Sequence, residues 1–422
     1  MNLIQEFRER ELLAQCTNLE LLEKWMGEKK LTFYIGFDPT ASSLHIGHFM
    51  QMKNMKRLQD AGHYAIALFG GGTAMIGDPS GKTDMRPMLT NEEVASHIAN
   101  FKIQMSKYID VSEGKALFVN NADWLCDIKY IDMLREVGAN FSVNRMLAAE
   151  CFKSRFEKGL SFLEFNYMIM QGYDFYKLYK DHGCTLQCGG DDQWSNIIAG
   201  VDLIRRKTLS DVPSASSVSQ DDKAIGLTFA LLPGADGTKM GKTSGNAVWL
   251  DPNLTSPYDF YQVWRNTDDS LVVKYLKMMT YVPIGEINEM EASFGDAKNI
   301  NAAKERLAYE LTTMIHGEDE AVKAQTAAKS LFYGSADSAN MPTTTLTDEN
   351  FADDSATVTI VDLLVIGGLA KSKREARQLI EQGGVLLDDV KVADISHSLT
   401  REQISASVVI KKGKKAFMKF VI

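Results

Sequence analysis

The chain is poor in cysteine, has no long apolar run and carries no overall excess of positive charge. Its five cysteines are an odd, scattered set among 422 residues, which favours free thiols over a disulfide framework. No apolar stretch is long enough to span a bilayer, and the charged run from Glu6 to Glu11 is unlike a signal peptide. These absences predict a soluble, cytoplasmic protein.

Cys184 and Cys188 are spaced closely enough to suggest a metal site. No second pair supplies the remaining ligands, so buried strand positions are the favoured interpretation and no metal ligands are predicted.

Charge is distributed unevenly along a chain whose net charge is −9. From Ala356 onward there are 11 Lys and Arg against 7 Asp and Glu, a net charge of +4, which leaves −13 for the rest. A basic C-terminal module on an acidic body points to a nucleic-acid partner.

The stretch from Tyr34 to His48 organises the rest of the chain. Residues 31–37 predict a strand, Asp38-Pro39 breaks it, and apolar residues then recur at helical spacing from Ile46. His45 and His48 would lie at the first turn of that helix, which attracts anions, and Gly47 would let a phosphate or ribose approach. Two ordinary histidines near a helix start remain the alternative.

Further short apolar runs alternate with helical patterns and predict a parallel sheet of the α/β class: 64–69, 116–119, 185–188 and 227–232. Polar residues fall at the expected carboxyl ends of the strands, where such sheets bind ligands: Asp38, Asp78, Gln187 and Asp192. Residues 1–30 are predicted to be helical. The mostly helical segment 122–155 exposes apolar residues such as Trp124 and Ile131, and is either an interface or core.

The chain is predicted to have three parts joined by a linker. A Rossmann-like catalytic domain occupies 1–232, and an α-helical domain with a glycine-rich loop follows at 233–333. Residues 334–357 are polar and aperiodic, which is typical of a linker. A small α+β module occupies 358–422.

The C-terminal module has a recognisable local pattern. One helix ends at Gly367-Gly368, Ser372 and Glu375 form a capping-box pattern for the next, and a hairpin turns at Asp388-Asp389. A basic cluster on the second helix could bind phosphate backbones, although a solvated helix face is the alternative: Lys371, Lys373, Arg374 and Arg377.

The segment Lys239-Met-Gly-Lys242-Thr places two lysines three residues apart in a glycine-rich loop. Together with His45-Ile-Gly-His48, it resembles the paired signature of class I aminoacyl-tRNA synthetases. Other segments resemble the bacterial tyrosyl-tRNA synthetases, and this resemblance covers essentially the whole chain: 36–40, 77–82, 167–174 and 189–194. Two positions depart from the pattern. Gly241 replaces a serine common in class I enzymes, although tyrosyl enzymes often carry glycine there. Asp191 replaces the family's usual serine near the expected ATP ribose.

The resemblance implies activation of tyrosine by ATP, followed by transfer of tyrosyl to the terminal ribose of tRNA(Tyr). Tyr34 and Asp174 would bind the phenolic hydroxyl, while Asp78, Tyr167 and Gln171 would hold the α-ammonium group. From spacing alone, Tyr167, Gln171 and Asp174 share one helix face that is either solvated or pocket-lining.

The resemblance also assigns the ATP site, with Mg²⁺ accompanying the nucleotide. Thr40 and His45 would stabilise the displaced phosphates, His48 would lie by the ribose, and mobile cations would assist: Lys82, Arg86, Lys239 and Lys242. The adenylate and its ribose would be held by Gly36, Asp38, Gly190, Asp192 and Gln193. The family is homodimeric, and its interface region matches 122–155. The helical domain and the basic module would bind tRNA.

Three alternatives remain. A tryptophanyl enzyme shares the fold, but an indole offers only a donor N–H to the pair Tyr34 and Asp174. A nucleotidyltransferase with a His-x-Gly-His motif leaves the helical domain and basic module unexplained. A non-catalytic RNA-binding protein does not need both histidines and both loop lysines.

Overall fold

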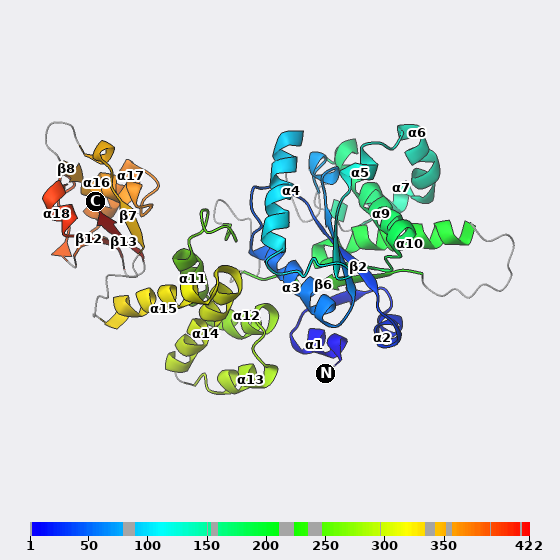
Figure 1. The fold of residues 1–422 in the computed structure, drawn as a ribbon, viewed down its shortest axis with the longest axis horizontal. Coiled ribbons are helices and arrows are strands. Elements are labelled where there is room, and N and C mark those ends of the chain that lie inside the picture. Colours follow the sequence, from blue (N-terminus) through cyan, green and yellow to red (C-terminus); the bar gives the residue numbers. More distant parts are fainter. Residues whose placement is uncertain are drawn as a thin grey trace. The chain divides into compact units, whose positions relative to one another are not determined.

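The computed structural model describes residues 2–78, 89–149, 151–152, 159–210, 223–234, 247–295, 297–333, 342–351, 357–388, 390–413 and 416–422. They form two compact units, Met1–His316 and Gly317–Ile422 (Figure 1). No helix within these ranges is long and apolar enough to cross a bilayer.

The first unit is built on a six-stranded sheet with the order β1-β6-β5-β2-β3-β4. Five strands are parallel, and the predicted α/β class is confirmed: β2 (Thr32–Phe37), β3 (Tyr64–Phe69), β4 (Ala116–Asn120), β5 (Leu186–Gly190) and β6 (Ile225–Phe229). The central residues of β2, β3, β5 and β6 are buried, which explains their continuous apolar runs, whereas β4 is only partly buried. Cys188 lies in β5, and all five cysteines are free.

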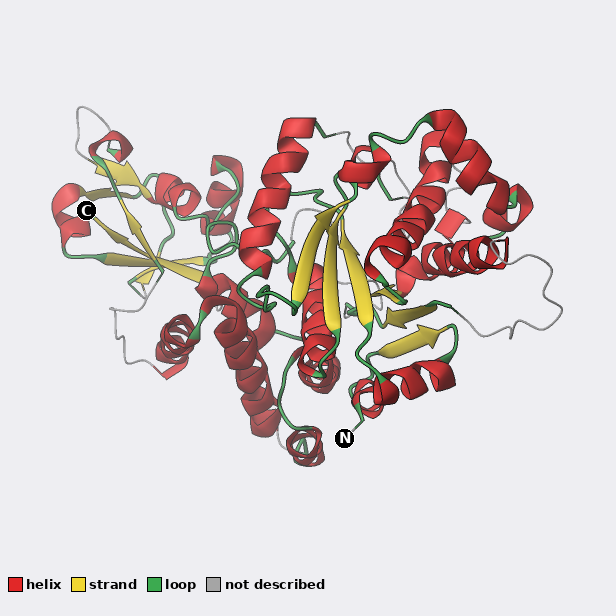
Figure 2. Ribbon diagram, turned by 45° about the vertical axis from the view of Figure 1, so that its right-hand side comes forward, coloured by secondary structure: helices red, strands yellow, loops and turns green. Residues whose placement is uncertain are grey.

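Helices flank this sheet on both sides (Figure 2). Before β5 the chain forms α3 (Ile46–Asp60), α4 (Asn91–Met105), α5 (Ala122–Leu125), α6 (Tyr130–Asp132), α7 (Val143–Leu147) and α9 (Phe162–His182). After β5 come the short 3₁₀ turn η4 (Asp191–Gln193) and α10 (Trp194–Ser210). Helix α3 packs on β2 and β3, whereas α10 packs on β5, β6 and α9.

The N-terminal thirty residues differ from the helix predicted for them. They form α1 (Leu3–Glu9), the strand β1 (Leu13–Cys16) and α2 (Leu19–Glu28). Glu11 has a φ of 58°, a left-handed conformation that ends the helix, and β1 then pairs antiparallel with β6. The apolar pair Leu12 and Leu13 therefore belongs to the sheet edge, because strand pairing overrides a helical pattern of only a few residues.

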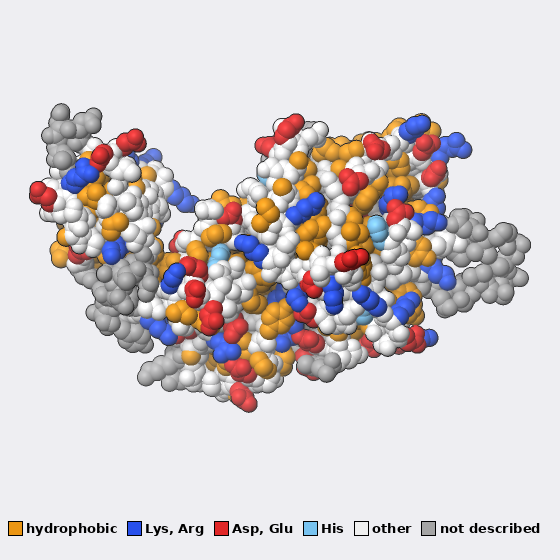
Figure 3. Space-filling view, viewed as in Figure 1, with side chains coloured by type: hydrophobic (Ala, Val, Ile, Leu, Met, Phe, Trp, Pro, Cys, Tyr) orange, Lys and Arg blue, Asp and Glu red, His pale blue; other side chains and the backbone are white. Residues whose placement is uncertain are grey.

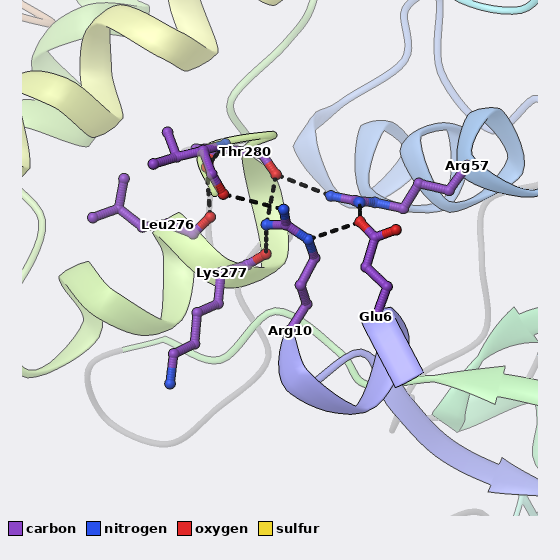
Figure 4. A network of polar contacts seen from close by, with 7 residues as sticks. Glu6, Arg10, Arg57, Leu276, Lys277 and Thr280 are labelled. Atoms are coloured by element: carbon purple, nitrogen blue, oxygen red, sulfur yellow. Dashed lines mark hydrogen bonds and ion pairs between the residues drawn. The ribbon is translucent and has the colours of Figure 1, made fainter. Parts of the chain in front are cut away.

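A second group of helices completes the first unit: α11 (Pro257–Arg265), α12 (Val272–Met279), α13 (Ile284–Ala292) and α14 (Ala297–His316). Ser256 caps α11 as predicted, accepting from the Asp259 N–H at 3.1 Å. Arg10 and Arg57 both bind Glu6 and donate to the Thr280 carbonyl at 3.2 and 2.9 Å (Figure 4). These contacts tie α1 and α3 to the end of α12.

The second unit begins with α15 (Glu318–Tyr333) and contains the predicted α+β module. Its helices are α16 (Ile360–Ile366), α17 (Lys373–Glu381) and α18 (Arg401–Ser405). One sheet has the order β10-β9-β12-β13-β7, and a small one pairs β11 with β8. The strands are β7 (Thr343–Thr345), β8 (Thr357–Thr359), β9 (Val385–Leu387), β10 (Val390–Lys391), β11 (Ser398–Thr400), β12 (Val408–Lys412) and β13 (Ala416–Val421).

Two details of this module concern the sequence predictions. The hairpin of β9 and β10 is confirmed, and Ser372 caps α17, but Glu375 accepts from the Lys371 N–H instead of closing the box on Ser372. The predicted linker is too long, because β7 pairs with β13, and Leu346 and Phe351 lie in the module core. β7 consists of three threonines at a sheet edge, so the sequence shows no alternation of apolar and polar residues that would identify it as a strand.

Candidate active site

The predicted polar residues gather where parallel strands end. Asp38 follows β2, Gly70 to Thr73 follow β3, Asn121 follows β4, and η4 follows β5. Strands β2 and β5 are neighbours from which the chain proceeds in opposite directions across the sheet, which is where open α/β sheets bind ligands. Gln187, expected at a strand end, instead lies within β5 opposite Tyr34.

Asp38 is the hub of one hydrogen-bonded group. It accepts from the Tyr167 hydroxyl at 2.9 Å and from the Thr73 hydroxyl at 2.8 Å. A Cβ at Gly70 would lie 2.0 Å from the Asp38 carboxylate and 2.4 Å from Thr73 Oγ1, so only glycine fits there. The glycine-rich loop after β3 thus makes room for this carboxylate and its partner.

Asp174, a buried residue on α9, is the hub of a second group. Its carboxylate accepts from Asn121 Nδ2 at 2.9 Å and from Trp124 Nε1 at 2.7 Å. Asn121 also donates to Thr73 Oγ1 at 3.1 Å, which links the two groups. Burial raises the pKa of Asp174 to about 7, although the two hydrogen bonds oppose that rise.

Tyr34 lies on β2 with its ring against Phe175, the two centroids being 5.4 Å apart. Burial, and then the nearby charge of Asp174, raise the pKa of its hydroxyl well above the ordinary value. Among the described residues, that hydroxyl has no hydrogen-bond partner, and neither has Oε1 of Gln171 or of Gln187. Because unpaired buried polar atoms are costly, this group suits a polar ligand.

Asp78, the remaining residue predicted to bind tyrosine, is buried and accepts from Gln193 Nε2 at 2.8 Å. Asn196 in turn donates to Gln193 Oε1 at 3.2 Å. The structure therefore brings together Asp38 with Tyr167 and Asp78 with Gln193, so each pair joins a residue assigned to tyrosine with one assigned to ATP.

The two histidines at the start of α3 are held rigidly by the backbone. His45 Nδ1 accepts from the Gly47 N–H at 3.0 Å, and His48 Nδ1 accepts from the His45 N–H at 3.2 Å. Their rings stack with centroids 3.8 Å apart. Since both Nδ1 atoms accept, neutral rings carry their proton on Nε2, which makes that atom a donor suited to an anion.

Three glycines and one threonine complete the described residues near the expected nucleotide site. A Cβ at Gly47 would meet the His45 ring at 2.9 Å, so this glycine makes room for the histidine ring, and its part in ligand approach stays a prediction. A Cβ at Gly190 would likewise meet Asp192 Oδ1 at 2.7 Å. Gly36 is exposed, and the Thr40 N–H donates to the Asp38 carbonyl at 2.8 Å.

Some predicted cations lie outside the described residues: Lys82, Arg86, Lys239 and Lys242. In the second unit, the four predicted tRNA-binding cations are exposed at the start of α17. One of them, Lys373, forms an ion pair with Asp362 at 2.6 Å.

Sequence reasoning missed three residues of the site: Thr73, Asn121 and Trp124. The first two have a visible signal, because they are polar and lie in the loops just after β3 and β4. Trp124 was interpreted as an exposed apolar residue of segment 122–155, either interface or core, but its indole N–H donates to Asp174.

Two family models match the chain. The model of the tRNA synthetases class I (W and Y) matches residues 26–333, and that of the Tyrosine--tRNA ligase SYY-like C-terminal domain matches 336–420. The tyrosine--tRNA ligase of Acetivibrio thermocellus is 52% identical over 99% of this chain and 98% of its own length. The enzyme of that name from Clostridium beijerinckii is also 52% identical, covering 100% and 99% respectively.

Solved structures agree with this fold. A truncated mitochondrial tyrosyl-tRNA synthetase from Aspergillus nidulans is 30% identical with a TM-score of 0.66, covering 78% of this chain and 94% of its own. The Archaeoglobus fulgidus enzyme complexed with L-tyrosine is 20% identical with a TM-score of 0.57, covering 76% and 99%, which concerns the fold alone. With both parts of the sequence matched and full-length relatives at 52% identity, the chain belongs to the tyrosine--tRNA ligase family of the class I tRNA synthetases.

Proposed function

We propose that the protein activates L-tyrosine with ATP to tyrosyl-adenylate and pyrophosphate, and then transfers tyrosyl to the terminal ribose of tRNA(Tyr). The observation that carries this proposal is the buried group of Tyr34 and Asp174, which suits a phenol. A phenylalanine ring would leave the Tyr34 hydroxyl unpaired and would give the Asp174 carboxylate no further donor. Tyrosyl-tRNA synthetases are the well-known example of enzymes that reject such an analogue strongly.

The roles within the tyrosine pocket follow from its chemistry. The hydroxyl of Tyr34 and the carboxylate of Asp174 bind the phenolic hydroxyl of the substrate. Asp78, Tyr167 and Gln171 hold the α-ammonium group, whose positive charge offsets the negative charges of Asp78 and Asp38. Asn121 and Trp124 hold the Asp174 carboxylate in place.

No protein nucleophile is needed, because the tyrosine carboxylate attacks the α-phosphate of ATP directly. Catalysis then consists of positioning and charge stabilisation. His45, His48 and Thr40 act on the phosphates and ribose, with the cations Lys82, Arg86, Lys239 and Lys242 beside pyrophosphate. Gly36, Asp38, Gly190, Asp192 and Gln193 line the adenylate site, and Mg²⁺ enters as the counterion of ATP.

A homodimer is part of the proposal. Large apolar side chains between 130 and 162 are exposed: Tyr130, Ile131, Leu134, Val143, Leu147 and Phe162. Hydrophobic side chains also gather on the visible face over α5 and α9 (Figure 3). A surface of this kind is typical of a protein interface. Ile131→Asp should shift the protein from dimer to monomer in analytical ultracentrifugation, with the exposed Ile103→Asp on α4 as the control.

The helical domain 233–333 and the module 358–422 are proposed to bind tRNA. Charge reversal at Lys371 and Arg374 should weaken charging roughly tenfold and reduce its salt dependence, while leaving adenylate formation unchanged. The exposed Lys24→Glu on α2 is the control. Charging that is unaffected by the reversal contradicts the role of the module.

The experiment that tests the activity is exchange of labelled pyrophosphate into ATP with each of the twenty amino acids. Exchange with tyrosine alone supports both activation and the pocket. Exchange with tryptophan instead would support amino-acid activation but refute the assignment of the tyrosine pocket. No exchange with any amino acid would refute the proposed activity.

A further inference from the structure

Three residues far apart in the sequence close a ring of hydrogen bonds beside η4. The Gln15 backbone N–H donates to Thr228 Oγ1 at 3.0 Å, and that hydroxyl donates to Asp191 Oδ1 at 2.7 Å. The side-chain amide of Gln15 completes the ring by donating to the same Asp191 oxygen at 2.8 Å. Thr228 is fully buried, so its hydroxyl depends on these partners.

A β-bulge in the edge strand makes this ring possible. Leu13 lies opposite Phe229, yet Gln15 lies opposite Thr228, so the register shifts by one residue between them. In an unbroken ladder, Ala14 would occupy the place opposite Thr228. Bulges often redirect a side chain next to an active site, and here the bulge directs the Gln15 amide towards η4.

The ring acts on the segment that carries proposed ATP-binding residues. η4 consists of Asp191, Asp192 and Gln193. Its first residue is bound to β1 and β6, and its third donates to Asp78 at 2.8 Å. The short turn is therefore fixed at both ends, and Asp192 lies between the two attachments.

We propose that Asp191 is a positioning residue that acts through Gln15 and Thr228 to fix η4 for ATP. This assigns a role to the family-atypical Asp191 and makes the N-terminal strand β1 part of the support of the ATP site. The inference rests on the proposed function. Its rival is a direct electrostatic effect of the Asp191 charge on the nucleotide.

The two explanations differ in what they require of Asp191. Positioning requires an oxygen that accepts the bonds from Gln15 and Thr228, which the neutral amide of Asp191→Asn also offers. A direct charge effect requires the carboxylate itself. Gln15→Met keeps the side-chain length and the Asp191 charge, but removes the donor.

The test is pyrophosphate exchange with tyrosine, measuring KM for ATP and for tyrosine separately. Gln15→Met is expected to raise KM for ATP about tenfold, because small displacements of binding groups are costly, with KM for tyrosine within about twofold. Asp191→Asn should keep both KM values within about twofold of wild type, and Asp191→Ala should behave like Gln15→Met. Gln5→Met is the control, since Gln5 is exposed on α1 and donates to Glu9.

Each outcome decides the proposal. A changed KM for ATP in Asp191→Asn supports the charge effect and overturns positioning. An unchanged KM in Gln15→Met overturns it too, as does a loss of thermal stability with both KM values preserved, which is the mark of a structural role. If the wild-type protein gives no exchange, both the proposed function and the positioning role are refuted. If the wild-type protein is active but the variants do not behave as expected, only the positioning role is refuted.

Discussion

Asp174 and Glu6 both anchor polar networks in the first unit, but with partners of different charge. Among the described residues, the donors to Asp174 are the neutral groups of Asn121 and Trp124, whereas Glu6 is bound by the guanidinium groups of Arg10 and Arg57. Neutral donors leave the charge of a buried carboxylate uncompensated, so burial raises the pKa of Asp174 to about 7.

The difference distinguishes a ligand-binding site from a network that only holds helices together. An uncompensated carboxylate gains from a further donor, such as a phenolic hydroxyl, while a carboxylate between two arginines is saturated. The Glu6 network accordingly joins α1, α3 and α12 (Figure 4). Near this network, Lys53 Nζ lies 3.7 Å from the centroid of the Tyr281 ring. Burial lowers the pKa of Lys53 well below its ordinary value, and the positive charges of Arg57 and Arg10 lower it further.

The largest expected effect is that of Asp174→Asn on tyrosine activation. The amide that replaces the carboxylate turns one N–H towards the donors of Asn121 or Trp124, so kcat/KM for tyrosine should fall about 1,000-fold. KM for ATP should change little. Asp181→Asn, at an exposed position on the same helix, is the matched control, and unchanged activation in Asp174→Asn would refute the pocket assignment.

The pH dependence of unfolding sharpens the same comparison. The folded-state pKa of Asp174 is about 7, above its usual 3.8, so the native state holds this proton more tightly than the unfolded state. Its contribution to stability is therefore present below about pH 4 and is lost as pH rises to about 7, a change of about 4 kcal/mol. The free energies of unfolding of wild type and Asp174→Asn, measured without ligand, should diverge over this range. Parallel curves would contradict the raised pKa.

Arg57→Met should disrupt the Glu6 network without affecting the tyrosine pocket. It leaves Glu6 with one arginine and removes a donor from the Thr280 carbonyl, so the free energy of unfolding should fall by about 3 kcal/mol. KM for tyrosine in the protein that remains folded should stay within about twofold of wild type. Lys56→Met, which removes a partly exposed pair with Asp60, is the control and should be nearly neutral.

The smallest expected effect is that of Trp124→Phe. It removes one neutral donor to Asp174, so KM for tyrosine should rise about tenfold. The lost hydrogen bond lowered the pKa of Asp174, so the pH below which tyrosine binding weakens should move upward. Trp25→Phe on α2 is the control, and a pH profile identical to wild type would show that Trp124 does not tune this carboxylate.

Some elements were readable from sequence because their signals are local. The five parallel strands are continuous apolar runs, and Ser256 and Ser372 mark helix starts three residues before an acidic side chain. The strands β1 and β7 were missed because both are short edge strands without a distinct period. Their existence depends on pairing with β6 and β13, which lie far along the chain.

The sequence by itself determined the α/β class, the histidine pair at a helix start, the basic C-terminal module and the residue set that marks the family. Only the tertiary structure decided that Trp124 donates to Asp174, 50 residues away in the sequence, and that Gln15 donates to Asp191, 176 residues away. The physical reason is that a local pattern fixes backbone conformation and burial. The charge state and direction of a polar side chain depend on donors that folding brings from distant segments.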